Sequence, residues 1–335
     1  MKLRYPSALR WQRLAKAAAN DISMDNALNS GLPAVIKLSN RCFSTSPRRS
    51  DASPSPFESK QLLPSRWLSD LKQRIGKCIT FGLNPGQIGK AGQILDTVAK
   101  DWKELSAGSE GFLTGVGRAG LVNQRVVWGE MDCMGHVNNV TYVRYAESAR
   151  VEWIQNYAVF MDPAHKREWS ELTTPKGTGL ILRSIRTDYK FVSWIYSVYP
   201  PSLGPRIPQA NAFSFFSPFK PMTWPDHISV YHKLRHRPTQ DSHSFILDVI
   251  IMSERMQRPA ARCEEDIVVY DYQRGAKTAL PPFVARHFTE TFRLQEEAKE
   301  RNTHRVLALL NQVEALEKES WNRSDAKEDL GSALV

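Results

Sequence analysis

The chain has 335 residues, of which 41% are hydrophobic, and a formal net charge of +10. This length allows one large domain or two small ones, and the hydrophobic content is enough to fill a core. No run approaches the roughly 18–20 apolar residues that cross a bilayer, which excludes a transmembrane protein. The four cysteines are scattered without a C-x-x-C pair, so neither a zinc site nor a disulfide framework is predicted. We expect no metal and no cofactor.

Half of the net charge lies in residues 1–43, which hold seven basic and two acidic side chains. The rest of the chain holds 38 basic and 33 acidic residues. This mild excess suits a ligand that carries phosphates and is far from the footprint of a nucleic-acid-binding protein.

The N-terminus has the composition of a targeting segment. Basic residues stand among Leu, Ala and Trp with no acid before Asp21, which is typical of a mitochondrial presequence. Arg41-Cys42-Phe43-Ser44 resembles a processing signal and predicts a mature start near Ser44. We therefore predict a presequence over 1–43 and a location in the mitochondrial matrix. The alternative is a disordered basic tail.

A Ser/Pro-rich stretch, 44–64, predicts a flexible linker. Apolar residues then recur at helical spacing in two short segments, which begin at Trp67 and Ile88 and are separated by Asn84-Pro85-Gly86. We predict that 65–120 is a helical N-terminal extension that packs on the main domain.

From residue 121 the pattern changes to strands around one long helix. Leu121–Trp128 predicts a strand and Asn138–Tyr157 a helix. The expected apolar face of this helix consists of Val140, Val143, Ala146, Ala149, Trp153 and Ile154. Four β-like runs follow, at 178–190, 226–236, 243–254 and 260–272. This order predicts an α+β domain over 121–284 with a mainly antiparallel sheet.

Two further segments flank or interrupt this domain. Residues 285–322 predict a charged C-terminal helix that packs on the body, followed by a disordered tail at 323–335. Residues 192–220 hold five prolines, seven aromatic residues and two charges, which suits neither a helix nor a central strand. We interpret 192–220 as an insertion, either a translated intron or a loop that binds a membrane or a partner. Sequencing of the mature transcript distinguishes the two.

The most specific signal is the run from Val127 to Tyr142, which contains Asp132-Cys133-Met134-Gly135-His136-Val137-Asn138-Asn139. This D-x-x-G-H-V-N-N-x-x-Y pattern, at a strand-to-helix junction, resembles the hotdog-fold acyl-CoA thioesterases of the 4-hydroxybenzoyl-CoA thioesterase class. The chain as a whole most resembles fungal mitochondrial members of the thioesterase/thiol ester dehydrase-isomerase superfamily. The resemblance implies a hotdog fold, in which an antiparallel sheet wraps around a long central helix, and a site between subunits of a homodimer or tetramer.

Thioester hydrolysis needs a nucleophile or a base for water, together with donors for the oxyanion. Asp132 lies just before the helix and suits either role. The amides of Gly135, His136 and Val137 are expected near the helix N-terminus, where unpaired N–H groups and the helix dipole favour developing negative charge. These residues are our candidates for the reacting carboxylate and for polarising the thioester carbonyl.

Each candidate also has a structural alternative. Asp132 is a good turn or N-cap residue. His136 either orients the loop or acts as a base. Asn138 and Asn139 either cap the helix or position water and the acyl group.

Two more candidates lie on the helix itself. Tyr142 either lines the pocket or packs in the core. Glu147 is the candidate base that the resemblance suggests on the central helix, or else pairs with Arg150 at i, i+3.

We therefore predict a thioester hydrolase that acts on an acyl-CoA, depends on Asp132, and needs no metal. The predicted catalytic residues are Asp132, His136 and Glu147, and the predicted substrate-binding residues are Gly135, Val137, Asn138, Asn139 and Tyr142. Two alternatives stay open: a catalytically silent hotdog protein with a structural role in a mitochondrial assembly, and an acyl-thioester dehydratase or isomerase. Acyl-chain specificity is not determined by the sequence.

Overall fold

The computed structural model describes residues 63–189 and 221–328. The predictions for the presequence, for most of the linker, for the 192–220 insertion and for the last residues of the tail fall outside these ranges. Within them, no helix is long and apolar enough to cross a membrane.

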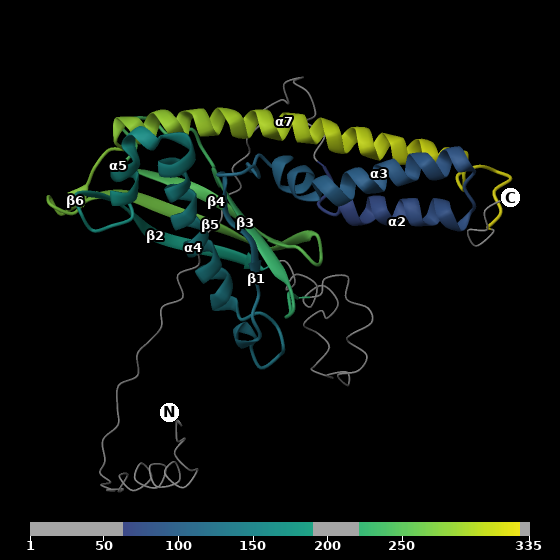
Figure 1. Cartoon of the computed structure of the whole chain (residues 1–335), viewed down its shortest axis with the longest axis horizontal. Helices are drawn as coiled ribbons and strands as arrows, with labels where there is room; N and C mark the ends of the chain where they lie inside the picture. Colours follow the sequence, from purple (N-terminus) through teal and green to yellow (C-terminus); the bar gives the residue numbers. More distant parts are fainter. Residues whose placement is uncertain (1–62, 190–220, 329–335) are drawn as a thin grey trace, which may run out of the picture. The chain divides into compact units, whose positions relative to one another are not determined.

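The described strands form one antiparallel sheet, as the sequence predicts (Figure 1). The strand order is β1-β3-β4-β5-β2, with the short β6 paired to β5, so β1 and β2 are the edges of the main path. The bounds are β1 Ala119–Arg125, β2 Thr178–Tyr189, β3 His227–Leu234, β4 Ser244–Ser253, β5 Arg258–Asp271 and β6 Ala276–Lys277. All five predicted strands are present, with ends shifted by a few residues.

Helix α4, Asn139–Asn156, packs on one face of this sheet. Its buried face carries Thr141, Tyr142, Tyr145, Ala146, Ala149, Trp153 and Ile154. The predicted face was wrong at Val140, which is 70% exposed, because Val140 lies on the outer side of the helix with the exposed Arg144 and Glu147. Val143 is half-buried. Tyr142 and Tyr145, which were not predicted for this face, are buried there.

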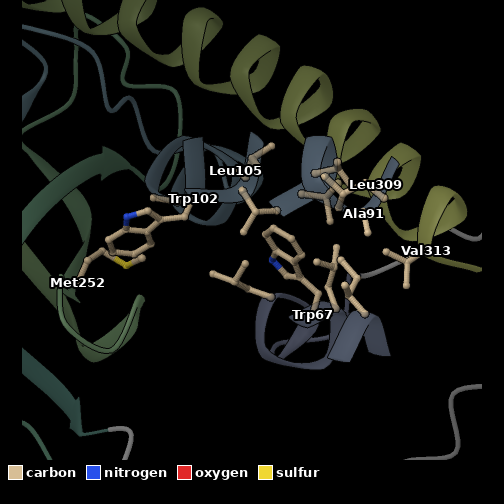
Figure 2. Packing of buried hydrophobic residues seen from close by; sticks show 14 of the residues in the cluster. Trp67, Ala91, Trp102, Leu105, Met252, Leu309 and Val313 are labelled. Carbon is tan, nitrogen blue, oxygen red and sulfur yellow. The ribbon is translucent and has the colours of Figure 1, made fainter. Parts of the chain in front are cut away.

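Three helices, which we call the helical layer, pack against one another beside the sheet and contact β3 and β4 from the side opposite α4: α2 Trp67–Thr80, α3 Pro85–Lys103 and α7 Pro282–Glu319 (Figure 1). The predicted N-terminal and C-terminal helices are thus present, and they pack against each other. Side chains alternate across a strand. Tyr231, Ile250 and Met252 therefore point away from α4 and into the helical layer. Figure 2 shows Met252 beside Trp102, and Trp67 among Ala91, Leu105, Leu309 and Val313.

The connection from α4 to β2 closes the far end of the helix–sheet core. A turn of π-helix, Tyr157–Met161, and the short α5, Lys166–Glu171, follow α4. Tyr157 and Trp169 stack with ring centroids 4.5 Å apart, and Phe288 from the start of α7 packs beside them. The site residues predicted from the sequence lie at the opposite, N-terminal end of α4.

Candidate active site at the N-terminus of α4

A tight turn, which we call the Asp132 turn (residues 131–137), precedes α4. A β-bridge pairs Met131 with Val137, and the Asp132 amide donates to the His136 carbonyl over 2.7 Å. Gly135 occupies the turn with φ +73°, a conformation that a side chain rarely adopts. The motif therefore specifies a hairpin-like turn that places residues 132–136 directly before the N-terminus of α4.

The Asp132 carboxylate is held by its own turn. Oδ1 accepts hydrogen bonds from the Met134 amide at 2.8 Å and the His136 amide at 3.1 Å. The side chain is half-buried, and no hydrogen bond from a described residue reaches Oδ2. One oxygen thus fixes the carboxylate while the other stays uncommitted, so the turn role and the chemical role predicted for Asp132 are compatible.

The three amides expected to polarise a carbonyl are already engaged. Gly135 donates to the Asp132 carbonyl at 3.1 Å, His136 to Asp132 Oδ1, and Val137 to the Met222 carbonyl at 2.9 Å. These hydrogen bonds stabilise the turn, so the three amides are not available to a ligand. The reason is that the chain folds back on itself before the helix starts. The sequence shows the helix N-terminus but not this folding back.

Helix α4 begins with Asn138 as its N-cap residue, as predicted. The side chain of Asn138 accepts from the Val140 amide at 3.1 Å, and its carbonyl accepts from Thr141. The next amide, that of Asn139, has no acceptor among the described residues. This amide lies in the first turn of the helix, where the dipole favours an anion.

The remaining predicted residues occupy different environments. Tyr142 is fully buried in the core cluster under α4, and its ring edge contacts Tyr189 with centroids 5.4 Å apart. Its hydroxyl has no partner within the described part of the chain. Burial, and then the neighbouring Tyr189 and Asp226, raise the pKa of Tyr142 above its ordinary value. Tyr142 therefore packs in the core but keeps an unused donor.

Glu147 lies on the solvent side of α4. Its carboxylate is 3.9 Å from Arg150, as the i, i+3 spacing predicts, and its side chain is 63% exposed. No described contact joins Glu147 to Asp132.

His136 is half-buried. Among the described residues, its hydrogen bonds are made by its backbone amide and carbonyl.

Two features near the turn were missed by the sequence reasoning. Glu130 is buried against α4 and binds three groups at once. Apolar residues surround the turn without cover, a set that we call the apolar rim: Val127, Trp128, Met134, Val140 and Trp224. The sequence signal for the first feature was Glu130, a carboxylate two residues before Asp132. The signal for the second was the pair of isolated tryptophans, Trp128 and Trp224.

A third feature lies under the middle of α4, where charged groups are buried. Glu265 on β5 binds Arg150 at 2.7 Å and lies 3.6 Å from His232 on β3; the side chains of Glu265 and His232 are fully buried. Burial alone would raise the pKa of Glu265, but the neighbouring His232 and Arg150 outweigh it and lower the pKa. The period of two correctly placed His232 on the buried face, but nothing in the sequence paired it with Glu265.

The region that holds the Asp132 turn, α4 and strands β2 to β6 is similar to a known family. Residues 126–288 match the model of the thioesterase-like superfamily. The Asp132 turn lies near the start of this matched region. No curated protein matches the chain in sequence.

Solved structures also resemble about half of the chain. A thioesterase from Thermus thermophilus, complexed with coenzyme A and Zn, is 16% identical, and the match covers 51% of this chain and 91% of that one with a TM-score of 0.32. A 1,4-dihydroxy-2-naphthoyl-CoA thioesterase from Synechocystis is 16% identical, with 49% and 91% covered and a TM-score of 0.32.

Proposed function

We propose that this chain is an acyl-CoA thioesterase, which hydrolyses an acyl-CoA to the free acid and CoA. The superfamily match supports thioester hydrolysis. The observation that carries the assignment to a site is the Asp132 carboxylate, whose Oδ1 is fixed by two amides while Oδ2 is uncommitted. A carboxylate held in this way is preorganised for chemistry at its free oxygen.

The reaction uses Asp132 in one of two ways. Oδ2 attacks the thioester carbonyl, giving an anhydride that water then opens, or it takes a proton from the water that attacks. In both routes the carbon–sulfur bond breaks and the CoA sulfur leaves as a thiolate that takes up a proton. Asp132 is required in either case, because no charge-neutral isostere supplies the nucleophile or the base.

The developing oxyanion is stabilised at the start of α4. The Asn139 amide lies in the first helical turn and has no acceptor in the described ranges. Loss of one such donor costs roughly 3–4 kcal/mol of transition-state stabilisation in well-studied enzymes. We assign the substrate-binding residues as Gly135, Val137, Asn138, Asn139 and Tyr142, with the first two acting through the shape of the turn.

His136 and Glu147 stay in the proposal as supporting groups. His136 fixes Asp132 through its backbone amide, and its imidazole makes no hydrogen bond within residues 63–189 and 221–328. Glu147 is accessible to a ligand or to a second copy of the chain.

The test is thiol release from short, medium, long and aromatic acyl-CoAs, with Asp132→Asn beside the wild type. A matched control is Asp271→Asn, because Asp271 Oδ1 also accepts two backbone amides in a turn, from Gln273 and Arg274. We expect Asp132→Asn to lose at least 10³-fold in kcat while Asp271→Asn keeps wild-type turnover. Equal turnover in both variants contradicts the role of Asp132. Silence of the folded wild type across the panel favours a binding role for the fold.

We also propose that the enzyme works as a homodimer or a tetramer. The apolar rim supports this, because Trp128 and Met134 are each 73% exposed beside the site, and such a patch is normally covered. Light scattering of the wild type and of Trp128→Lys tests the proposal. We expect the variant to dissociate, and an unchanged mass contradicts the use of this surface.

The remaining expectations are that the enzyme resides in the mitochondrial matrix and needs no metal. The basic, acid-poor N-terminus supports the first. Fluorescence of the first 43 residues fused to a reporter tests the location. Thiol release after exhaustive chelation tests the metal, and activity that returns only with an added divalent ion contradicts the expectation.

A further inference from the structure

Glu130 connects three parts of the chain around the Asp132 turn. Its Oε2 accepts from the Val127 amide at 2.9 Å and from the Tyr145 hydroxyl at 2.5 Å. Its Oε1 pairs with Arg144. Its backbone carbonyl accepts from the Asn138 amide at 2.9 Å, so Glu130 also holds the N-cap of α4.

These contacts lie at the base of the Asp132 turn, where the chain enters and leaves it. The Glu130–Asn138 hydrogen bond comes directly after the Met131–Val137 bridge, and together they form the base of the hairpin that carries Asp132. Tyr145 and Arg144 lie in the second turn of α4, so the carboxylate ties the strand side of the hairpin to the helix side. The direction in which Asp132 Oδ2 points therefore depends on Glu130.

Glu130 is unsuited to react itself. Its side chain is only 10% exposed, and both oxygens are occupied. Burial, with the hydrogen bond to Glu130, raises the pKa of Tyr145 above its ordinary value, so Tyr145 stays a neutral donor to this carboxylate. Arg144 neutralises the negative charge of Glu130. Without Arg144, an unpaired carboxylate would lie two residues before Asp132.

We propose that Glu130 is the positioning residue of this site: it locks the Asp132 turn onto α4 and thereby sets the orientation of the reacting carboxylate. This inference rests on the proposed thioesterase activity. A displacement of about 1 Å in a reacting group can cost about 10²-fold in rate.

The first experiment compares Glu130→Ala, Glu130→Gln and Glu317→Ala by kcat and KM for acyl-CoA hydrolysis. Glu317 is the matched control, because its side chain is also 10% exposed and binds Arg74 through both oxygens, in the helical layer. We expect Glu130→Ala to lower kcat about 10²-fold with KM changed less than about threefold. Glu317→Ala should keep wild-type kcat in its folded fraction.

Glu130→Gln provides the rescue. The amide oxygen can take the place of Oε2 and keep the bonds from Val127 and Tyr145, while only the pairing with Arg144 is lost. We expect kcat of Glu130→Gln to be at least tenfold higher than kcat of Glu130→Ala. If Glu130→Ala does not fold, Tyr145→Phe replaces it, with a smaller loss of kcat in the same direction.

Amide hydrogen exchange gives a readout independent of activity. The Met134 and His136 amides, which hold Asp132 Oδ1, should exchange at least tenfold faster in Glu130→Ala and at the wild-type rate in Glu317→Ala. If the wild type hydrolyses no acyl-CoA, the proposed function fails and this exchange still decides the role of Glu130. Wild-type kcat or wild-type exchange in Glu130→Ala, or no recovery in Glu130→Gln, overturns the inference.

Discussion

The face of the sheet under α4 and the part of the opposite face that meets the helical layer bury different chemistry. The helical layer meets the sheet through Tyr231, Ile250 and Met252, among the apolar side chains of three helices (Figure 2). Under α4, apolar clusters lie on either side of the ionised pair Arg150–Glu265 and of His232. The candidate site lies at the N-terminal end of this second face.

The difference assigns separate tasks to the two faces. Apolar burial stabilises by roughly 1.5–3 kcal/mol for each large side chain, and it is indifferent to pH. A buried ion pair adds little net stability but is very sensitive to the loss of one partner. The helical layer thus supports the sheet, and the α4 face carries the groups whose geometry must stay fixed.

The largest effect is expected from Glu265→Gln. The change leaves Arg150 buried without its anion, which should lower the free energy of unfolding by about 3–5 kcal/mol at pH 7. The neighbouring Glu264 points to the other face and pairs with Arg235 at the surface, so Glu264→Gln should cost less than about 1 kcal/mol. Urea unfolding measures both, and equal losses would abolish the contrast between the faces.

The same pair predicts a pH dependence. The pKa of Glu265 is lowered in the folded state, so its contribution to stability is fully present above its ordinary value of 4.5 and is lost as the pH falls through the folded pKa. The stability gap between wild type and Glu265→Gln should therefore be constant near pH 7 and shrink below about pH 4.5. A gap that widens in acid contradicts this assignment.

In the helical layer, Leu71→Ala should reduce the free energy of unfolding by about 3 kcal/mol. Leu71 of α2 is fully buried, and the truncation leaves a cavity. We expect kcat of the folded fraction to be unchanged, because α2 does not reach the Asp132 turn. Ile79→Ala on the same helix is the control, since Ile79 is 45% exposed. A fall in kcat for Leu71→Ala would show that the two faces are coupled.

At the start of α4, Asn138→Ala should cost about 1 kcal/mol, because the Val140 amide loses its cap. Asn138→Ser keeps a capping oxygen and should retain most of this stability. Thermal unfolding compares the two variants. Equal melting temperatures for Asn138→Ala and the wild type would contradict the capping role.

The smallest effect on stability is expected from Tyr142→Phe. The Tyr142 hydroxyl has no partner among residues 63–189 and 221–328, so its removal should change the free energy of unfolding by less than about 0.5 kcal/mol. A loss above about 1 kcal/mol would reveal a partner in the folded chain. A fall in kcat without a change in stability would place the hydroxyl on the substrate.

Much of this architecture could be predicted from residue patterns. The alternation of Ile228, Val230, His232 and Leu234 predicted the buried side of β3, and the Asn138 cap predicted where α4 begins. The superfamily followed from one run of residues at a strand-to-helix junction. The site residues stay predictions, since their roles depend on activity.

Other properties depended on contacts between distant segments. Val140 was assigned to the apolar stripe but is exposed, because the side of α4 that packs on the sheet carries Tyr142 and Tyr145 instead. The amides of Gly135, His136 and Val137 were expected to be free, yet each finds an acceptor when the chain folds back.

The sequence by itself determined the order of strands and helices along the chain, the side of β3 and β4 that faces α4, and the chemical identity of the Asp132 motif. The periodicity of a helix or strand and the preferences of a turn depend on residues that are close in the sequence, so a local pattern is enough to predict them. Only the tertiary structure decided that Glu130 holds the turn through Arg144 and Tyr145, and that Glu265 meets Arg150 and His232. These pairings join residues up to 115 positions apart, and no local pattern encodes which buried charge will face which.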